Sequence, residues 1–521
     1  MAHDPSTTGS FLRSNVLEAL DRTVLRVPDK VAFSNGTEAL TFRQVHAQSR
    51  AVGTFLAQRG LHRRPVAVFM ARHPKTVTAF LGVAAAGCFY APLDEEMPAF
   101  RIELIFRTLS PACVICDAGT RKALDRMGYA GDAFLYDEIA ATPEDPAALD
   151  AVRARHVDVD PLYVVFTSGS TGVPKGVVAN HRSVIEYVGV LSDALGFSEE
   201  TVFGMQVPLY FDACLKEIFP TLMFGATTYL IPKGLFMFPV RLVEYLNQHR
   251  VNTVCWVVSA LTMISAFGTF EKAVPSSLRT VAFGSEVFPV RQLALWRKAL
   301  PEAKFTNLYG PTEATGMTCF YPLDREFGEG ESVPIGRPFP NREVLLLDDE
   351  GREAAPGELG EICVRGTSVT MGYYNAPDKT AAAFVQNPLN PFYPETIYRT
   401  GDLGRRNERG ELMFVSRKDY QIKHMGHRIE LGEIEADVQL VEGVRLACAV
   451  YDKPTERIVL YYVGSVSPAD LLSELRTRLP RYMLPNAVEP LDRMPLTANA
   501  KIDRAALLAY TEQARGEDPH G

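Results

Sequence analysis

The sequence predicts an α/β fold, with a large N-terminal domain of layered α/β subdomains and a β-rich subdomain, followed by a small mobile α+β domain. Three observations predict it: helical and β-rich runs alternate first, the texture changes near residue 330, and a compact segment begins near residue 417. Since 521 residues exceed one ordinary hydrophobic core, two or more domains are expected. We place the boundary so that residues 1–416 form the core domain and residues 417–521 the C-terminal domain.

The N-terminal part alternates helical patterns with short β-rich runs, which indicates layers with largely parallel sheets. The helical patterns are SNVLEALDRTVLRV, HAQSRAVGTFLAQRG and KTVTAFLGVAAAG, and the β-rich runs are RPVAVFMA, ACVICD, TTYLIP, VNTVCWV and LRTVAFG. Cys113 and Cys116 have CxxC spacing, but no second cysteine pair and no turn before a helix accompanies them. A short buried strand is therefore the favoured interpretation of this pair.

The later part of the chain has a different pattern. REVLLLDDEG, GELGEICVRG and GELMFVSRKD predict hairpin strands joined by glycine turns, hence a β-rich subdomain. Beyond residue 417, the runs QIKHMGHRIEL, EIEADVQLV, RLACAVYD, RIVLYYVG and PADLLSELRTRLP predict a compact α+β segment.

Composition excludes several kinds of partner. A hydrophobic content of 47% and a charged content of 22% are typical of soluble globular proteins. The net charge of −8 argues against nucleic acid, which needs a surplus of Lys and Arg. No uncharged apolar run approaches the ~20 residues that span a bilayer, and the polar start MAHDPSTTGS does not resemble a signal peptide. We expect a cytoplasmic protein without nucleic-acid or membrane partners.

The strongest local signal is YVVFTSGSTGVPKGVVANH, residues 163–181. A β-rich run enters a loop in which glycines let backbone N–H groups converge, while hydroxyls and a lysine add further donors for a phosphate. It is not a Walker A loop, because the spacing differs and no helix follows at once. Such a loop alone is more often an ordinary connector, so the prediction of a phosphate site depends on the other motifs of the chain.

Ten motifs follow one another along nearly the whole chain. They are LTFRQV (40–45), AAAGCFYAPLD (84–94), FTSGSTGVPKG (166–176), FDACLKEIF (211–219), NLYGPTE (307–313), GELGEICVRG (357–366), YRTGDL (398–403), SRKDYQIKHMGHRIELGEIE (416–435), LPRYMLP (479–485) and NAKIDR (499–504). In this order the chain resembles the acyl-adenylate-forming superfamily, and within it the amino-acid-activating adenylation domains of nonribosomal peptide synthesis. The resemblance implies an AMP-forming ligase that uses ATP and Mg²⁺.

The resemblance also assigns roles at a nucleotide site. Joining a carboxylate to the α-phosphate brings two anions together, so charge neutralisation and alignment should dominate catalysis. Lys501 would bridge the α-phosphate and the substrate carboxylate, Glu313 would help to hold Mg²⁺, Tyr309 would stack on adenine, and Asp402 would accept from the ribose hydroxyls. The expected nucleotide-binding residues are Thr167, Ser168, Gly169, Ser170, Thr171, Gly172, Lys175, Gly284, Ser285, Asn307, Tyr309, Gly310, Thr312, Asp402 and Arg417.

Asp419 stands at the family's hinge. The resemblance implies that the small domain swivels about it. One pose would present Lys501 for adenylation, and the other would present Gly426 and His427 beside a channel for a phosphopantetheine thiol.

Residues 210–219 read YFDACLKEIF, with Asp212 and Lys216 four apart at the edge of an apolar stripe. The residues alone favour a helix N-cap and an (i, i+4) ion pair. The resemblance instead implies that Asp212 pairs with the α-ammonium of an amino acid, since relatives that activate fatty or aryl acids lack this acid. The stripe consists of Leu215, Ile218, Phe219 and Leu222.

The residues that match the family's substrate pocket are mostly small, apart from one lysine. They are Asp212, Ala213, Lys216, Ala260, Ala282, Gly284, Leu308, Gly316 and Met317. Lys216 has two interpretations. It reads a side-chain carboxylate of glutamate or aspartate, or its stem fills the pocket while its ammonium reaches solvent or an acid. We favour the second, with alanine, serine or glycine as substrate, because the other lining residues offer no polar partner.

The chain ends soon after Lys501. In that layout it resembles D-alanine–carrier protein ligases and the free-standing enzymes of macrolactam polyketide pathways. The expected partner is therefore a separate acyl or peptidyl carrier protein, loaded on its phosphopantetheine thiol or, as an amide, on the amine of an aminoacyl carrier protein. The expected setting is the biosynthesis of a natural product such as an antibiotic.

Two other functions compete with this prediction. Asp212 opposes an acyl-CoA synthetase that uses free CoA. The intact set of Lys175, Glu313, Asp402 and Lys501 opposes a nucleotide-binding scaffold without catalysis.

Overall fold

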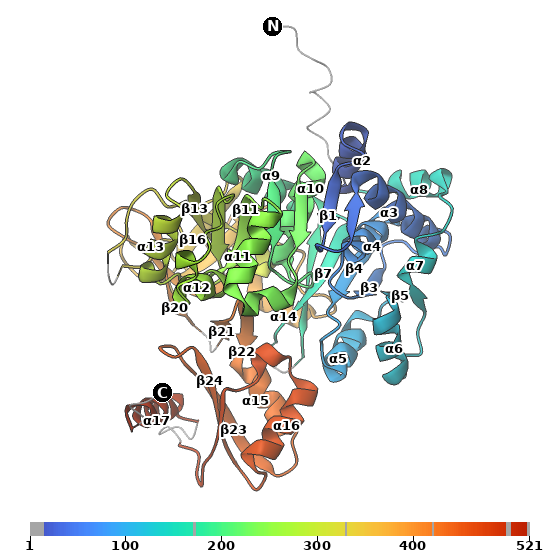
Figure 1. The fold of residues 1–521 in the computed structure, drawn as a ribbon. Coiled ribbons are helices and arrows are strands. Elements are labelled where there is room, and N and C mark those ends of the chain that lie inside the picture. The colour runs from blue at the N-terminus through green and yellow to red at the C-terminus, as the bar shows by residue number, and fades with distance from the viewer. Residues whose placement is uncertain (1–14, 170–172, 329–330, 419–420, 496–501, 518–521) are drawn as a thin grey trace. The chain divides into compact units, whose positions relative to one another are not determined.

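The computed structural model describes residues 15–169, 173–328, 331–418, 421–495 and 502–517, and it has the predicted mixed α/β fold (Figure 1). Contacts divide the chain into two units. The first comprises Met1–Glu95, Leu109–Val165 and Gly176–Lys418, and the second comprises Glu96–Thr108, Phe166–Lys175 and Asp419–Gly521. The predicted domain boundary between residues 416 and 417 stays a prediction.

One sheet has six strands in the order β6-β5-β3-β4-β7-β8. Pairing of β3 with β4 and β5, of β4 with β7 and of β5 with β6 is parallel, as the alternating pattern predicts. The strands are β3 (Pro65–Phe69), β4 (Phe89–Leu93), β5 (Cys113–Cys116), β6 (Ala133–Leu135), β7 (Pro161–Thr167) and β8 (Lys175–Asn180). The CxxC pair thus forms a fully buried strand, which confirms that prediction.

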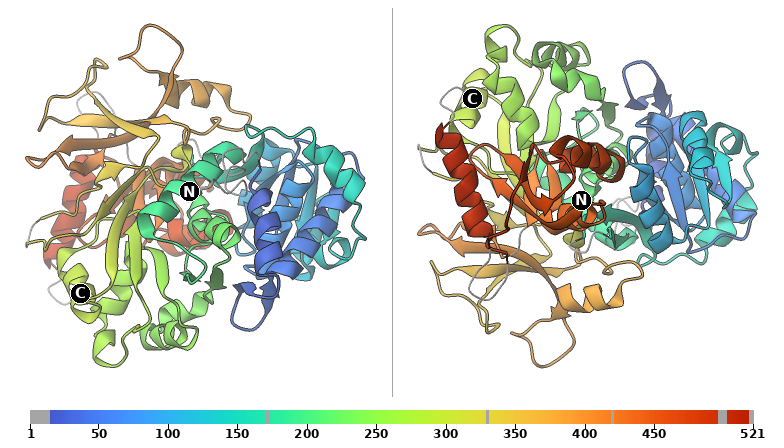
Figure 2. Two further views of the ribbon diagram at one scale, coloured as in Figure 1. Left: turned by 90° about the horizontal axis from the view of Figure 1, so that it is seen from above. Right: turned by 90° about the horizontal axis from the view of Figure 1, so that it is seen from below.

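Two helices of the first unit, α3 (Phe42–Ala57) and α4 (Pro74–Ala85), lie side by side (blue in Figures 1 and 2). Helix α3 begins with a capping box in which the side chains of Thr41 and Gln44 each bond the other's backbone N–H. The helices approach closely because Gly53 of α3 faces α4 and Gly82 of α4 faces α3. A Cβ on Gly82 would lie 2.5 Å from Cβ of Val52, and one on Gly53 would lie 2.7 Å from Cβ of Ala85.

A second sheet has nine strands in the order β15-β14-β13-β12-β11-β9-β10-β1-β2. Its centre is parallel, with β12 between β11 and β13, and its margins are antiparallel. The strands are β1 (Val31–Ser34), β2 (Ala39–Thr41), β9 (Val202–Met205), β10 (Thr227–Leu230), β11 (Thr253–Val257), β12 (Thr280–Gly284), β13 (Lys304–Tyr309), β14 (Cys319–Pro322) and β15 (Arg337–Pro338).

Most helices of the first unit contribute side chains to the buried apolar clusters of these two sheets. Besides α3 and α4 these helices are α2 (Leu17–Arg26), α7 (Tyr136–Ile139), α9 (His181–Leu195), α10 (Leu215–Phe224), α11 (Pro239–Gln248), α12 (Val258–Ala266) and α13 (Val290–Ala299). The first unit also contains α6 (Ala118–Arg126), α8 (Pro146–Arg153) and α14 (Pro377–Ala383). Short 3₁₀ turns are η1 (Asp212–Cys214), η2 (Lys233–Met237), η3 (Thr269–Glu271) and η4 (Thr312–Ala314).

The β-rich subdomain predicted beyond residue 330 is an antiparallel sheet in which β16, β17, β19 and β18 pair in turn and β20 pairs with β19. The strands are β16 (Arg342–Leu347), β17 (Gly360–Gly366), β18 (Phe384–Gln386), β19 (Thr396–Arg406) and β20 (Leu412–Arg417). The pairing of β19 with β20 sets Asp402 opposite Arg417.

The second unit is the predicted compact α+β segment together with helix α5 and the phosphate loop. Its apolar core lies between β23–β24 and the helices α15 and α16. Its elements are α5 (Ala99–Leu109, of which Leu109 belongs to the first unit), β21 (Gln421–His424), β22 (His427–Glu430), α15 (Leu431–Gln439), β23 (Val444–Asp452), β24 (Arg457–Gly464), α16 (Pro468–Arg478), η5 (Arg481–Met483), β25 (Ala487–Pro490) and α17 (Arg504–Glu517). Among the helices described in either unit, none is long and apolar enough to cross a membrane.

The glycine contact between α3 and α4 gives a matched pair of variants. Gly82→Ala should lower the free energy of unfolding by about 1–3 kcal/mol, because the new methyl group meets Val52 in a filled interface. Gly189→Ala in α9 should raise it by about 0.5–1 kcal/mol, because nothing lies within 4 Å of the new methyl and alanine favours a helix. Calorimetric unfolding of both variants checks this, and equal effects of the two substitutions would contradict the packing described.

Candidate active site

Asp212 opens the turn η1 that leads into α10, and its carboxylate is held by a segment about a hundred residues away. Its Oδ1 accepts a hydrogen bond from the Thr312 hydroxyl at 3.2 Å, and its Oδ2 accepts one from the backbone N–H of Gly316 at 3.2 Å. Desolvation by burial raises the pKa of Asp212 above its usual range, against the lowering effect of the Thr312 hydrogen bond and the nearby Lys216. A desolvated carboxylate of this kind favours a cationic ligand.

Neither role that the residues alone favoured for Asp212 is present. The cap of α10 is Cys214, and no side-chain hydrogen bond caps the helix or the preceding turn η1. Within the described residues, no ion pair joins Asp212 to Lys216. The capping interpretation is therefore wrong, and of the pairing interpretation only the effect of Lys216 on the pKa of Asp212 remains.

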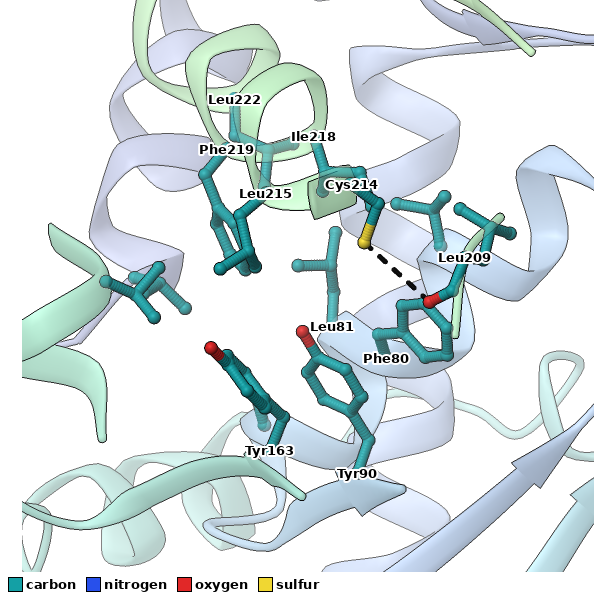
Figure 3. Close-up of a cluster of buried hydrophobic side chains, with 14 of the residues drawn as sticks. Phe80, Leu81, Tyr90, Tyr163, Leu209, Cys214, Leu215, Ile218, Phe219 and Leu222 are labelled. Atoms are coloured by element: carbon teal, nitrogen blue, oxygen red, sulfur yellow. Dashed lines mark hydrogen bonds between the residues drawn. The ribbon is translucent and has the colours of Figure 1, made fainter. Parts of the chain in front are cut away.

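The predicted apolar stripe of α10 is confirmed. Leu215, Ile218, Phe219 and Leu222 are buried in one cluster with Phe80, Leu81 and Tyr90 of the neighbouring elements (Figure 3). The thiol of Cys214 donates to the carbonyl oxygen of Leu209 at 3.7 Å. Packing of this face fixes α10, and with it the position of Asp212.

Lys216 and Glu217 are both buried, with exposed fractions of 4% and 0%. The ammonium of Lys216 therefore does not reach solvent, which excludes one of the two directions that the sequence left open. Burial raises the pKa values of the nearby acids Asp212 and Glu217, and the positive charge of Lys216 partly opposes this effect.

Glu217, next to Lys216 in α10, is a buried acid to which the motifs gave no role. Neither of its carboxylate oxygens has a hydrogen-bond partner among the described residues. Burial raises the pKa of Glu217 to about 8, although Lys216 and Arg72 oppose the shift. Arg72 is held by the carbonyl oxygens of Met205, at 2.7 Å, and Ile231, and burial lowers its pKa to about 10. In the sequence, the only indication of a special role for Glu217 is its charge within the apolar run of α10.

The predicted nucleotide residues Tyr309, Asp402 and Arg417 meet in one cluster. The Tyr309 hydroxyl donates to Oδ2 of Asp402 at 2.5 Å, and Arg417 donates to Oδ1 at 2.5 Å. The backbone N–H of Asp402 donates to Oγ1 of Thr400 at 2.9 Å. Strands β13, β19 and β20 supply these groups, so the β-rich subdomain and the nine-stranded sheet build the cluster together.

Glu313 lies in η4, beside the Asp212 anchor, and is fully buried. One carboxylate oxygen accepts a hydrogen bond from the Tyr373 hydroxyl at 2.8 Å, and its backbone carbonyl accepts one from Thr370 N–H at 3.0 Å. No group of three or more metal-ligating side chains occurs among the residues that the structure covers. A single carboxylate fits Mg²⁺, which commonly takes one or two protein carboxylates and fills its other positions with phosphates and water.

The remaining predicted pocket residues lie along β12, β13 and their neighbours. Gly284 pairs with Leu308 across these strands, and a Cβ on Gly284 would lie 2.2 Å from the Leu308 carbonyl oxygen. A Cβ on Gly310 would lie 2.4 Å from the Gly316 carbonyl oxygen. The glycines are thus needed for close backbone approach. Ala260, Ala282, Leu308 and Met317 are buried, Ala213 is partly buried, Ser285 follows β12 with a φ of 70°, and Asn307 donates to the Pro334 carbonyl at 2.9 Å.

The phosphate loop joins β7 directly to β8, so no helix follows it, as predicted. Thr167 ends β7 and Lys175 begins β8. In the second unit, the Ser168 hydroxyl donates to the Arg428 carbonyl at 2.8 Å, and Gly169 N–H donates to the Glu433 carboxylate at 3.1 Å. Lys175 Nζ lies 3.8 Å from Glu430, and Glu433 also pairs with Arg101. Carboxylates therefore occupy donors that were predicted for phosphate.

Several predicted residues lie outside the described part of the chain: Ser170, Thr171, Gly172, Asp419 and Lys501. Gly426 and His427 are described, with Gly426 in the turn between β21 and β22. The His427 ring stacks on Tyr482 with centroids 3.6 Å apart, and burial lowers its pKa to about 3. Its imidazole is therefore neutral at physiological pH.

The buried carboxyl of Glu217 predicts a pH-dependent stability. Because its folded-state pKa is raised to about 8, the folded state keeps a proton that the unfolded state loses, and stability falls as pH rises from the usual carboxyl range to about 8. At roughly 1.4 kcal/mol per pKa unit the loss amounts to a few kcal/mol. Glu217→Gln should therefore raise the thermal midpoint more at about pH 8.5 than at about pH 5.

The matched control for this comparison is Glu244→Gln, the same change at an exposed position of α11. It should shift the midpoint equally at both pH values. A pH-independent effect of Glu217→Gln would show that burial of this carboxyl does not carry the expected penalty.

Comparison with known proteins identifies the family. Residues 20–374 match the family of AMP-binding enzymes. Tyrocidine synthase 1 of Brevibacillus parabrevis is 30% identical over 92% of this chain and 43% of its own length, and bacitracin synthase 1 of Bacillus licheniformis is 30% identical over 99% of this chain and 10% of its own length. The chain thus spans less than half the length of these relatives.

A solved structure, that of holo-PA1221, "an NRPS protein containing adenylation and PCP domains", aligns with a TM-score of 0.80 at 24% identity, over 95% of this chain and 84% of that one. This likeness confirms the predicted fold. The match over residues 20–374 confirms the predicted resemblance: the chain belongs to the family of AMP-binding enzymes.

Proposed function

We propose that the protein is an ATP-dependent ligase that activates a small α-amino acid as aminoacyl-AMP and then transfers it to a separate carrier protein. One observation carries the amino-acid part. The Asp212 carboxylate is anchored by Thr312 and Gly316, and it makes no capping hydrogen bond in α10. A carboxylate so placed pairs with a substrate ammonium.

The described residues fit the proposed chemistry. An oxygen of the substrate carboxylate forms a bond to the α-phosphorus of ATP, and pyrophosphate leaves with the electrons of the broken bond. When bound, Mg²⁺ would offset the phosphate charge, and Glu313 would help to hold it. The cluster of Tyr309, Asp402 and Arg417 would bind the nucleoside. By its motif alone, Lys501, which lies outside the described residues, would neutralise charge where the two anions meet.

A small, neutral side chain is the preferred substrate feature. Alanines at positions 213, 260 and 282 leave little polar lining, and Leu308 and Met317 are apolar. Lys216 is buried near Asp212, whose carboxylate offsets its ammonium without help from a substrate carboxylate. The alternative, in which Lys216 reads the carboxylate of glutamate or aspartate, needs a further polar partner that this lining does not offer.

The acceptor is proposed from the relatives. Holo-PA1221 contains a PCP domain beside its adenylation domain, which supports a carrier protein as the partner here. Transfer to a phosphopantetheine thiol and transfer to an amine of an aminoacyl carrier are both open. The named relatives synthesise tyrocidine and bacitracin, which supports nonribosomal peptide assembly as the setting. A polyketide macrolactam or antibiotic product and a cytoplasmic location stay predictions.

The experiment that tests the substrate is ATP–pyrophosphate exchange with a panel of amino acids. Alanine, serine or glycine should exceed glutamate and aspartate in kcat/KM by at least about 10-fold, the scale at which pocket size and unpaired charge discriminate. Lys216→Met keeps the length of the stem without the charge, and it should preserve exchange with the small amino acid.

Glutamate or aspartate far above alanine, with loss of that activity in Lys216→Met, would overturn the proposal in favour of the carboxylate-reading lysine. Exchange with carboxylic acids that lack an amine, together with product formation on free CoA, would favour an acyl-CoA synthetase. Mass spectrometry of loaded carrier proteins separates thioester from amide.

A further inference from the structure

We infer that Tyr187 of α9 is the wall that limits the amino-acid pocket to small side chains, and that its hydroxyl is the hydrogen-bonding group of that wall. Tyr187 lies outside every motif that the sequence offered. The inference rests on the proposed function and names a specificity-determining residue for it.

The ring of Tyr187 fills the space that a side chain at position 316 would need. A Cβ on Gly316 would lie 2.6 Å from both Cε1 and Cζ of the ring and 2.9 Å from its hydroxyl oxygen. Gly316 also has a φ of 73°, which disfavours any other residue. The backbone N–H of Gly316 is the group that holds Asp212. The ring therefore packs directly behind the anchor for the substrate ammonium.

Arg342 fixes this wall in place. Its side chain is fully buried, it donates to the Met317 carbonyl oxygen and, at 2.7 Å, to Glu186, and its guanidinium carbon lies 5.3 Å from the Tyr187 ring centroid. Strand β16, helix α9 and the segment after Gly316 are thereby tied to one group. Because these contacts hold the Tyr187 ring, the ring cannot easily move aside for a larger substrate side chain.

The Tyr187 hydroxyl is buried, and it has no hydrogen-bond partner among the described residues. Buried polar groups are almost always paired, so an unpaired one beside a binding segment points to a ligand atom. Burial raises the pKa of Tyr187 well above its usual value, so the hydroxyl keeps its proton and can donate or accept. A hydroxyl on a short substrate side chain, as in serine, would pair with it.

The test compares exchange kinetics of the wild type with three variants over glycine, alanine, serine, valine and leucine. Tyr187→Leu should raise the kcat/KM ratio of leucine to alanine by about 10- to 100-fold, because ring volume behind Gly316 is lost. Tyr187→Phe keeps the ring, so leucine should stay excluded, but the ratio of serine to alanine should fall by about 10-fold as the hydroxyl is removed.

The matched control is Tyr136→Leu. Tyr136 of α7 is buried in the same apolar cluster, its hydroxyl donates to Gln48 at 2.8 Å, and it is not among the nearest neighbours of Gly316. This substitution removes the same side-chain volume as Tyr187→Leu, and it should leave the ranking of amino acids unchanged.

The outcomes separate this inference from the proposed function. If the wild type activates no amino acid, the proposed function fails. If the wild type activates small amino acids but Tyr187→Leu keeps the wild-type ranking, or Tyr136→Leu broadens it equally, Tyr187 is not the wall. If Tyr187→Leu does not fold, Tyr187→Phe still decides: an unchanged serine-to-alanine ratio overturns the role of the hydroxyl.

Discussion

The two hydrogen bonds that Asp212 accepts from Thr312 and Gly316 are the constraint on which the site depends. They bring the start of α10 against the turn that contains Glu313, so the hydrogen-bond partners of Asp212 and the predicted metal ligand lie in one short segment. They also leave the carboxylate desolvated, and a desolvated carboxylate is stable only with partners of opposite polarity. Two neutral donors satisfy part of that need, and a substrate ammonium would satisfy the rest.

Close backbone packing makes this arrangement possible. Gly284, Gly310 and Gly316 each lie where a Cβ would meet a neighbouring backbone or ring at less than 3 Å. Thr312 and Gly316, in the segment that follows β13, can therefore reach hydrogen-bonding distance of Asp212. The charge of Asp212 is also partly balanced, because Lys216 in the interior of the same unit favours its ionised form against desolvation.

Periodicity and composition predicted what depends on local sequence. The apolar stripe of α10, the buried strand at Cys113–Cys116 and the antiparallel sheet beyond residue 330 follow from spacing and glycine turns, and the structure has all three. The anchoring of Asp212 could not be predicted in this way, since its partners lie about a hundred residues away and an N-cap has the same local pattern.

Other site features were missed for the same reason. Glu217, Arg72 and Arg342 are charged residues whose burial is set by tertiary packing, and Tyr187 has no motif because its role comes from the missing side chain at Gly316. The catalytic role of Lys501 and the hinge at Asp419 rest on motifs alone, because both residues lie outside the described part of the chain.

The central claim is that Asp212 selects an α-ammonium. It is tested most directly by ATP–pyrophosphate exchange with alanine and with propionate, which differ only in that group, using the wild type and Asp212→Asn. The account predicts exchange with alanine and not with propionate, and a loss of at least about 100-fold for alanine in the variant, the scale expected for removing one partner of a buried charged pair. Wild-type exchange with propionate, or unchanged alanine exchange in a folded Asp212→Asn variant, would contradict it.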